Sequence, residues 1–449
     1  MTAMPDFPPG FVWGVSTAAY QIEGATKDDG RGPSVWDVFA AREGTISDGH
    51  TGDVACDHYH RWPEDVSLMG GLGLTGYRFS ISWSRILPSG SGAVNAAGVA
   101  FYDRLVDGLL ERGIAPVPTL FHWDLPQGLE DGGGWMNRDT AHRFAEYTEI
   151  MADALGDRVK RWITLNEPFV HMAWGYALGS HAPGRVLLFD ALPTAHHQLL
   201  GHGLATRALQ SRGLEAMISN NCTPVSPESP GDEAAASAYD NLHNRLFLDP
   251  IHLGRYPDLS AYGDDGTLGG SVRDGDLEII STRPDAQGIN YYNPTLIRTP
   301  AEPGLPFEEA RIEGVPRTAF DWPIVPDGLR ELLVRFKQRY PGLPPVYITE
   351  NGCSVADEVV DGAVHDPDRV AYLDAHLRAI HAAIEEGVDV RGYFTWTLLD
   401  NFEWAEGYHQ RFGLIHVDHE TQVRTPKTSY GWYRDLIADQ LSRTSSGTS

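Results

Sequence analysis

The sequence predicts an α/β fold, a single (β/α)8 TIM barrel with extended βα loops that spans residues 1–449. Short β-branched or aromatic runs recur along the chain, with helix-like stretches between them, which is the pattern of a parallel sheet. Eight such runs are present, the number that closes this barrel. A length of 449 residues permits one domain, because barrels with long loops exceed about 400 residues.

Each predicted strand is a short apolar run bounded by turn residues. The eight runs are Phe11–Thr17, Tyr77–Trp83, Ala115–Phe121, Trp162–Glu167, Met217–Cys222, Gly288–Tyr292, Val346–Glu350 and Gly392–Leu398. The predicted helices place apolar residues three and four positions apart, so that one face is apolar. They include Asn95–Arg112, Arg138–Leu155, Leu192–Arg212, Asp327–Arg339 and Pro367–Glu386.

No change of composition and no long linker divides the chain, so we interpret it as one catalytic domain. The Pro- and Glu-rich stretch Thr299–Arg317 is predicted to be a loop insertion. The polar segment Leu441–Ser449 is predicted to be a flexible tail.

The charge of the chain restricts its partners. Its 61 acidic and 35 basic residues give a formal net charge of -26, which repels nucleic acid and acidic membrane surfaces. The substrate is therefore expected to be neutral or cationic. The segment Met1–Gly10 lacks the pattern of a secretion signal, and no apolar run reaches about 18 residues, so a soluble cytoplasmic protein is expected. Cys56, Cys222 and Cys353 are expected to be reduced core residues.

One glycine-rich motif resembles a nucleotide site. The segment Gly71–Gly76 matches the spacing of a dinucleotide fingerprint, but it precedes a predicted strand, whereas phosphate binding requires a strand before it and a helix after it. We therefore interpret it as a tight turn between a helix and a strand.

Two other motifs are also interpreted as structural. His58 and His60 lie at the start of a helical stretch, and the histidines at 196, 197 and 202 lack the spacing and the glutamate of a zinc helix. The glycosylation pattern Asn221-Cys222-Thr223 falls at a predicted strand end in a chain without a secretion signal. No metal and no cofactor are expected.

The predicted strand ends hold the strongest chemical signal. A parallel barrel places its chemistry at the carboxyl ends of its strands. Glu167 ends the fourth strand and Glu350 the seventh, so both carboxylates fall at one rim although they are far apart in sequence. Hydrolysis of a glycosidic bond requires two carboxyl groups on either side of a sugar, one as acid and one as nucleophile or base. The two glutamates satisfy that requirement if the barrel closes.

The motifs around these residues resemble glycoside hydrolase family 1, the β-glucosidase family. The resemblance runs from Phe11 to about Trp432. The matching segments are Phe11–Gly24, Tyr77–Arg85, His122–Pro126, Thr164–Pro168, His181–Gly184, Asn290–Tyr292, Ile348–Gly352, Trp396–Trp404, Gly407–Tyr408 and Arg411–Leu414. A single short segment carries little information, whereas all of them in order are highly specific.

The resemblance implies a role for each matching residue. Glu167 is similar to the acid/base and Glu350 to the nucleophile. The groups expected to orient and ionise the nucleophile are Arg78, Asn290 and Tyr292. The groups expected to bind the substrate are Gln21, His122, Trp123, Asn166, Trp322, Trp396, Glu403, Trp404 and Phe412. Arg78 and the Tyr292 hydroxyl are expected to lower the pKa of Glu350, whose charge is expected to raise the pKa of Glu167.

The implied activity is that of a retaining exo-β-glycosidase. It removes terminal non-reducing β-D-glucosyl residues, or galactosyl or fucosyl residues, through a covalent glycosyl-enzyme. Its expected partners are small neutral β-glycosides and oligosaccharides, including those of cellulose and polysaccharide degradation. A transglycosylase of the same fold remains an alternative, whereas a silent sugar-binding protein would lack one carboxylate. A homo-oligomer is the default assembly.

Three residues depart from the family pattern. Ser16 stands where alanine is more common in the opening segment. Val170 and His171 follow the acid/base segment at a place where a small polar or sulfur residue is common, and they are expected near the leaving group. They concern the aglycone preference and leave the predicted reaction unchanged.

Overall fold

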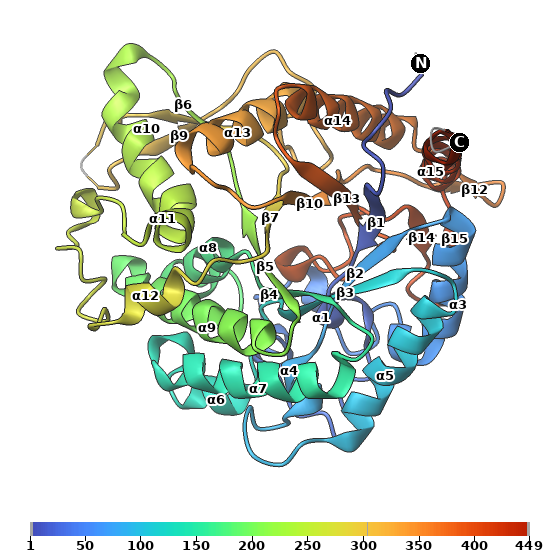
Figure 1. Ribbon diagram of the computed structural model, residues 1–449, viewed down its shortest axis with the longest axis horizontal. Helices are drawn as coiled ribbons and strands as arrows, with labels where there is room; N and C mark the ends of the chain where they lie inside the picture. The colour runs from blue at the N-terminus through green and yellow to red at the C-terminus, as the bar shows by residue number, and fades with distance from the viewer. Residues whose placement is uncertain (1–2, 303, 447–449) are drawn as a thin grey trace.

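The computed structural model describes residues 3–302 and 304–446 as a ring of strands surrounded by helices (Figure 1). Eight parallel strands close the barrel in the order β1-β13-β10-β7-β5-β4-β3-β2. Their bounds are β1 Val12–Ser16, β2 Gly76–Ser80, β3 Ala115–Phe121, β4 Arg161–Asn166, β5 Glu215–Asn221, β7 Ala286–Asn290, β10 Val346–Asn351 and β13 Val390–Trp396. The predicted barrel is confirmed. The second strand is shorter than predicted, because the chain turns after Ser80 and helix α4 begins at Trp83.

The outer helices follow the apolar periodicity closely. The main ones are α3 His58–Leu72, α5 Ala96–Leu110, α7 Asp139–Leu155, α9 Leu192–Gln210, α13 Pro326–Arg339, α14 Pro367–Glu385 and α15 Thr428–Ser446. Asn95 caps α5 through its side chain, which accepts a hydrogen bond from the Ala97 amide. Pro326 and Pro367 begin their helices, where a fixed φ favours the first turn.

Shorter elements occupy the loops. The helices are α1 Ala19–Ile22, α2 Val35–Ala40, α4 Trp83–Ile86, α6 Gln127–Asp131, α8 Pro168–Val170, α10 Glu233–Asp240, α11 Leu246–Leu253 and α12 Asp276–Ile280, and the π-helical segments are His171–Ala177 and Asn241–Arg245. The strands are β6 Val225–Pro227, β8 Thr295–Arg298, β9 Glu308–Ala310, β11 Val359–Val360, β12 Ala363–Val364, β14 Ile415–Val417 and β15 Arg424–Pro426. The βα loops are thus extended, as predicted, and many hold structure of their own.

The predicted loop insertion Thr299–Arg317 needs one correction. Within it, Glu308–Ala310 forms β9, which pairs antiparallel with β8, and β8 pairs with β6. The guanidinium of Arg298 on β8 also binds the Glu308 carboxylate. A strand of three residues is too short for a period of two to show in the sequence, so its pairing comes from the neighbouring strand. Residue 303 lies outside the described residues, as do 447–449 of the predicted tail.

One end of the barrel is filled with side chains. A separate apolar cluster takes one residue from each of six barrel strands: Val117, Ile163, Met217, Ala286, Tyr347 and Phe394. Gly14 and Gly76 give the Phe394 ring its space, because a Cβ on Gly14 would lie 2.3 Å from the ring. The interior is therefore a packed core, and the polar strand ends at the other rim are left to form a site.

The glycine-rich segment Gly71–Gly76 and the histidine motif at His58 have structural roles. Helix α3 ends at Leu72, Gly73 takes a left-handed φ of 71°, and β2 begins at Gly76, so the predicted turn is confirmed. His58 binds Asp65 at 2.7 Å, and both side chains are buried. Among the described residues, no group of three or more His, Cys, Asp and Glu side chains is arranged to hold a metal ion. No helix in the described part of the chain has the length and apolarity needed to cross a membrane.

Candidate active site

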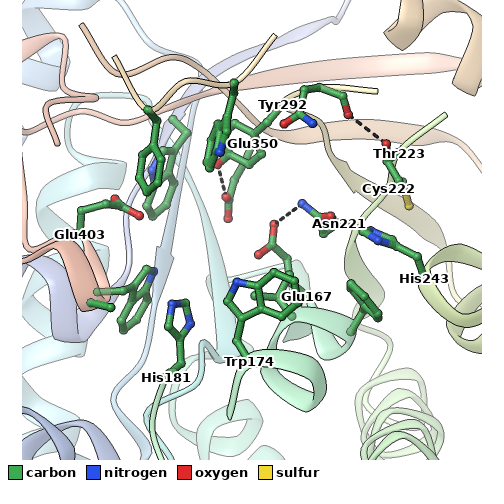
Figure 2. Close-up of a pocket in the computed structure, with 18 of the residues that line it drawn as sticks. Glu167, Trp174, His181, Asn221, Cys222, Thr223, His243, Tyr292, Glu350 and Glu403 are labelled. Atoms are coloured by element: carbon green, nitrogen blue, oxygen red, sulfur yellow. Dashed lines mark hydrogen bonds between the residues drawn. The ribbon is translucent and has the colours of Figure 1, made fainter. Parts of the chain in front are cut away.

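A cavity of about 460 Å³ opens at the carboxyl ends of the barrel strands (Figure 2). Its lining includes ten of the predicted residues: His122, Trp123, Glu167, Tyr292, Trp322, Glu350, Trp396, Glu403, Trp404 and Phe412. The other four, Gln21, Arg78, Asn166 and Asn290, are fully buried and bond to lining residues. The structure therefore brings together every residue that the sequence assigned to the site.

Both carboxylate oxygens of Glu350 accept strong hydrogen bonds. Arg78 donates to Oε1 at 2.5 Å, and the Tyr292 hydroxyl donates to Oε2 at 2.6 Å. These two donors favour the ionised form. Burial nevertheless raises the pKa of Glu350 above its ordinary value of 4.5, with Arg78 and Tyr292 opposing the rise. Arg78 and Tyr292 thus act in the expected direction, but full burial outweighs both donors.

Glu167 faces Glu350 across the cavity in Figure 2 and has weaker partners. The Asn290 amide donates to its Oε1 at 2.8 Å and the Asn221 amide at 3.3 Å. Burial first, and then the charge of Glu350, raise the pKa of Glu167 from 4.5 to about 8. Because Oε1 accepts both amides, the proton of the acid form resides on Oε2.

A buried network couples the two carboxyl groups. Asn166 accepts from Arg78 at 2.6 Å and from Asn290 at 3.0 Å through its Oδ1. Arg78 therefore connects the nucleophile candidate Glu350 to Asn166, the last residue of β4, which directly precedes Glu167. Ser16, the departure in the opening segment, accepts a 3.1 Å bond from the same guanidinium. The site is held by partners that leave little freedom to its two reacting groups.

Polar side chains at the Glu403 end of the cavity have unused hydrogen-bonding capacity within the described structure. Gln21 donates to Glu403 at 3.4 Å, and its own buried Oε1 has no partner among the described residues. Asn166 donates to Nε2 of His122, and the buried Nδ1 of His122 has no partner in the part of the chain that the structure describes. Burial and the charges of Glu350 and Glu167 raise the pKa of Glu403 to about 8. Unsatisfied buried polar groups are costly, so these atoms are suited to receive hydroxyl groups of a ligand.

Aromatic rings form the remaining walls. Trp404 packs against Trp123 with ring centroids 4.7 Å apart, and Trp396 stacks on His122 at 5.9 Å. Trp322 forms a second wall with Tyr292, at 5.2 Å, and with Phe412, at 6.0 Å. The apolar C–H face of a sugar packs well on such rings, while its hydroxyls need the polar groups beside them.

Three site residues have a left-handed backbone conformation, which residues other than glycine rarely adopt. Trp123, Glu167 and Trp404 have φ values of 77°, 45° and 49°. Each lies just after a barrel strand or at the start of a short helix, where the chain must turn sharply to aim the side chain at the cavity. Strained backbone of this kind is concentrated at functional sites, because the surrounding structure holds it in place.

A buried ionic cluster anchors the loop that carries Glu403 and Trp404. Lys427 binds Asp400 at 2.8 Å and Asp357 at 2.7 Å, and all three side chains are fully buried. Arg369 also binds Asp357 at 2.8 Å. Because Asp400 stands three residues before Glu403, this cluster fixes the start of the segment.

Replacing Lys427 by alanine is expected to destabilise the fold by about 3–5 kcal/mol, because two buried carboxylates each lose one of the cations that bind them. Urea unfolding measures this loss. Lys160 is the control, since its ammonium binds the carbonyl groups of Gly156 and Asp157 at the surface and no carboxylate among the described residues. Lys160→Ala should change stability by no more than about 0.5 kcal/mol. Equal stability of the two variants would contradict the anchoring role.

The sequence missed part of the site. Asn221 was considered only as a glycosylation acceptor, yet its side chain reaches Glu167, and His243 lies behind it in Figure 2. Asn221 ends β5, and that position was the available signal. His243 lies on a π-helical segment that no sequence pattern marked. Val170 lines the cavity as expected, but His171 packs against Phe121 and Tyr176 instead.

The two carboxyl groups can divide a reaction between them. Glu350 is held by a cation and a phenol, whereas Glu167 accepts from two amides, and burial and the charge of Glu350 raise its pKa to about 8. Cleavage of a glycosidic bond requires this division, so the fold and the site define a glycoside hydrolase. The chain belongs to glycosyl hydrolase family 1, because the sequence model of that family matches residues 3–441.

Relatives of known activity are similar over nearly their whole length. The chain is 50% identical over 436 residues to the thermostable beta-glucosidase B of Thermobispora bispora. This match covers 96% of this chain and 90% of that protein. It is 46% identical over 464 residues to the bifunctional beta-D-glucosidase/beta-D-fucosidase of Bifidobacterium breve, covering 97% and 99%. The crystal structure of the psychrophilic beta-glucosidase BglU from Micrococcus antarcticus matches with a TM-score of 0.94 at 48% identity, covering 97% and 98%. The family predicted from the motifs is confirmed, and the chain is an enzyme of the β-glucosidase type.

Proposed function

We propose that this enzyme removes terminal non-reducing β-D-glucosyl residues from small neutral β-glycosides and oligosaccharides, with retention of configuration. The observation that carries the proposal is the asymmetry between two facing carboxyl groups, one bonded to Arg78 and Tyr292 and the other to amides alone. The β-fucosidase activity named for the Bifidobacterium breve relative extends the proposal to β-D-fucosides. β-D-Galactosides differ from glucosides at one hydroxyl and are a further candidate.

The first step forms a covalent intermediate. Glu350 attacks the anomeric carbon, and the bond from that carbon to the leaving oxygen breaks. Glu167 gives the proton on its Oε2 to the leaving oxygen, and the alcohol departs. Arg78 and Tyr292 hold Glu350 in its ionised form and aim it at the carbon. Trp396 is proposed to support the sugar ring. The groups proposed to bind its hydroxyls are Gln21, His122, Asn166, Glu403 and Trp404.

The second step restores the enzyme. The ester bond to Glu350 removes a negative charge that had raised the pKa of Glu167, so Glu167 is now ionised more readily. It accepts a proton from water, and the water oxygen attacks the anomeric carbon as the ester bond breaks. Because the carbon is attacked twice from opposite faces, the product keeps the β configuration. A sugar hydroxyl in place of water would give transglycosylation, and product analysis with an added acceptor separates the two outcomes.

The stereochemistry of the first product tests this mechanism. Proton NMR during hydrolysis of an aryl β-glucoside is expected to show β-glucose before mutarotation produces the α anomer. The two carboxyl groups are then expected to be about 5–5.5 Å apart, the spacing of retaining enzymes. The appearance of α-glucose first would contradict the proposal. A panel of aryl β-glycosides, cellobiose and longer oligosaccharides then ranks the substrates.

Glu403 predicts which sugars are rejected. Its carboxylate can accept hydrogen bonds from two sugar hydroxyls, such as those at the 4- and 6-positions. A dianionic phosphate on the 6-oxygen would meet this buried side chain: ionised Glu403 would repel it, and protonated Glu403, favoured by the raised pKa of about 8, would leave the phosphate desolvated without a cation, so either contact costs several kcal/mol. Neither lysine nor arginine lines the described cavity. We therefore expect kcat/KM for a 6-phosphorylated aryl β-glucoside to be at least about 100-fold below that of the neutral compound.

The matched variant for this prediction is Glu403→Ser. Its kcat/KM on the neutral sugar should fall. The ratio of kcat/KM between the neutral and the phosphorylated substrate should also become smaller, because the acidic group that opposes the phosphate is gone. Turnover of the phosphorylated compound that equals turnover of the neutral one in the unaltered enzyme would remove the assignment of Glu403.

The cellular setting of the enzyme is proposed from its cysteines. Cys56, Cys222 and Cys353 are buried free thiols, which is typical of the reducing cytoplasm, so we propose a cytoplasmic enzyme. Its oligosaccharide substrates are proposed to come from cellulose degradation. The barrel is proposed to be the whole catalytic domain, and a symmetric homo-oligomer is the default assembly. Cell fractionation and light scattering test location and assembly.

A further inference from the structure

A short hydrogen-bonded chain leads away from Glu167 on the side opposite Glu403. Asn221 at the end of β5 donates to Glu167 through its amide nitrogen at 3.3 Å. The amide oxygen of Asn221 lies 2.8 Å from Nε2 of His243. Nδ1 of His243 lies 3.2 Å from the Tyr239 hydroxyl. The chain thus runs from the acid/base through β5 to the helical region Glu233–Arg245 (Figure 2).

The protons in this chain can be placed from donor and acceptor chemistry. The oxygen of Asn221 is only an acceptor, so Nε2 of His243 must carry hydrogen. Burial lowers the pKa of His243 to about 3, so the ring is neutral and Nδ1 is an acceptor. The Tyr239 hydroxyl lies 3.2 Å from Nδ1 and 3.3 Å from the Glu309 carboxylate, so its single hydrogen is shared between these two acceptors. His243 therefore has one defined tautomer, with its N–H directed at Asn221.

This tautomer fixes the orientation of the Asn221 amide. If the amide rotated by half a turn, its oxygen would face the Glu167 carboxylate and its NH₂ would face the N–H of His243. Both contacts would then be repulsive. His243 itself has little freedom, because its ring packs on Phe169 with centroids 3.9 Å apart and its side chain is buried.

We propose that His243 is a positioning residue for the acid/base Glu167, acting through the amide of Asn221. The proposal rests on the acid/base role given to Glu167 above. By keeping an N–H on Oε1 of Glu167, His243 stabilises the carboxylate form that takes a proton from water in the second step. It also leaves Oε2 free to carry the proton toward the leaving oxygen in the first step.

Other charged and titratable groups surround the two residues and set the background. Those around Glu167 are Glu350, Glu403, Arg78, Tyr292 and Cys222. Those around His243 are Asp240 and Tyr239, with Glu309 bonded to Tyr239 at 3.3 Å. A substitution at His243 leaves all of them in place, so its effect on Glu167 passes through Asn221.

The test compares His243→Phe with His243→Gln. Phenylalanine keeps a ring beside Phe169 but has no N–H, whereas glutamine can place an N–H near the position of Nε2. In His243→Phe, Glu167 loses an ordered donor to its ionised form, so the alkaline limb of kcat/KM should move to higher pH by about half a unit or more. On an activated aryl glucoside, where the second step limits turnover, kcat and KM should both fall about 5-fold. His243→Gln should recover most of both changes.

A double-mutant cycle identifies the route. In an Asn221→Ala background, His243→Phe should cause no further shift of the alkaline limb, because the connecting amide is gone. Tyr239→Phe should shift the limb in the same direction as His243→Phe and by less. His376→Phe is the packing control, since that buried imidazole also stacks on an aromatic ring, Tyr372, at 3.9 Å. It should leave the limb unchanged.

The outcomes are distinguishable. An unshifted limb in His243→Phe, equal losses in the phenylalanine and glutamine variants, or additive effects of His243→Phe and Asn221→Ala would each overturn the proposal. If His243→Phe does not fold, the Tyr239→Phe and Asn221→Ala variants supply the same comparison. Failure of the unaltered enzyme to hydrolyse any aryl β-glycoside would instead contradict the proposed function.

Discussion

Replacing Glu350 by glycine is expected to reduce hydrolysis roughly 10⁴-fold or more, because the covalent route through this carboxylate disappears. A loss of that size corresponds to about 5.5 kcal/mol of lost transition-state stabilisation. Arg78 and Tyr292 would remain, but the group that they hold would be absent. Steady-state kinetics with an aryl β-glucoside, on protein shown by circular dichroism to be folded, measures the loss.

Added azide gives this variant a distinctive product. Azide can enter the space that the carboxylate vacates and attack the anomeric carbon from that side, so an α-glycosyl azide should form. The control is Glu358→Gly, an exposed glutamate eight positions along the chain, which should keep normal activity. A β-glycosyl azide from Glu350→Gly would mean that the two catalytic roles are reversed.

Replacing Glu167 by alanine is expected to have an effect that depends on the leaving group. Alcohols that leave poorly need a proton, so their glycosides should lose about 10²–10⁴-fold in kcat/KM. Activated aryl glycosides need little protonation, and their first step should be nearly unchanged. Azide should then yield a β-glycosyl azide, because it attacks the covalent intermediate in place of water. Equal losses on both classes of substrate would contradict the role of Glu167.

The pH dependence provides a second measurement on the same variant. Glu167 must be protonated in the first step, and its pKa is raised to about 8 in the folded enzyme. Activity of the unaltered enzyme should therefore fall as the pH rises through about 8. Glu167→Ala, tested on an activated glycoside, should lack this alkaline limb. Persistence of the limb in the variant would assign it to another group, such as Glu403, whose pKa is also about 8.

Much of the fold and the site could be predicted from the sequence, for reasons visible in particular residues. The eight strands show because each is a short apolar run, and barrel geometry then places Glu167 and Glu350 at one rim. The tryptophans and polar groups of the cavity were assigned through the resemblance of their motifs to family 1, and strand position alone would not have supplied residues such as Trp322 and Phe412.

Other features depend on contacts that no sequence pattern encodes. β9 exists because β8 offers it a pairing edge, and Lys427 is buried because Asp357 and Asp400 surround it. His243 reaches the site only because the region after β5 folds back over Asn221. Each of these features is decided by a partner that only the folded chain brings into contact.

The sequence by itself determined the barrel and the rim position of Glu167 and Glu350, because periodicity and strand ends are local properties of the chain, and the motifs in order determined the family and most of the site. The tertiary structure alone decided the balance of charge. Arg78 and Tyr292 were expected to favour an ionised Glu350, yet complete burial raises the pKa of Glu350. Burial also raises the pKa of Glu167, to about 8. Burial and distance set the energy of a charge, and both arise only when the whole chain has packed around it.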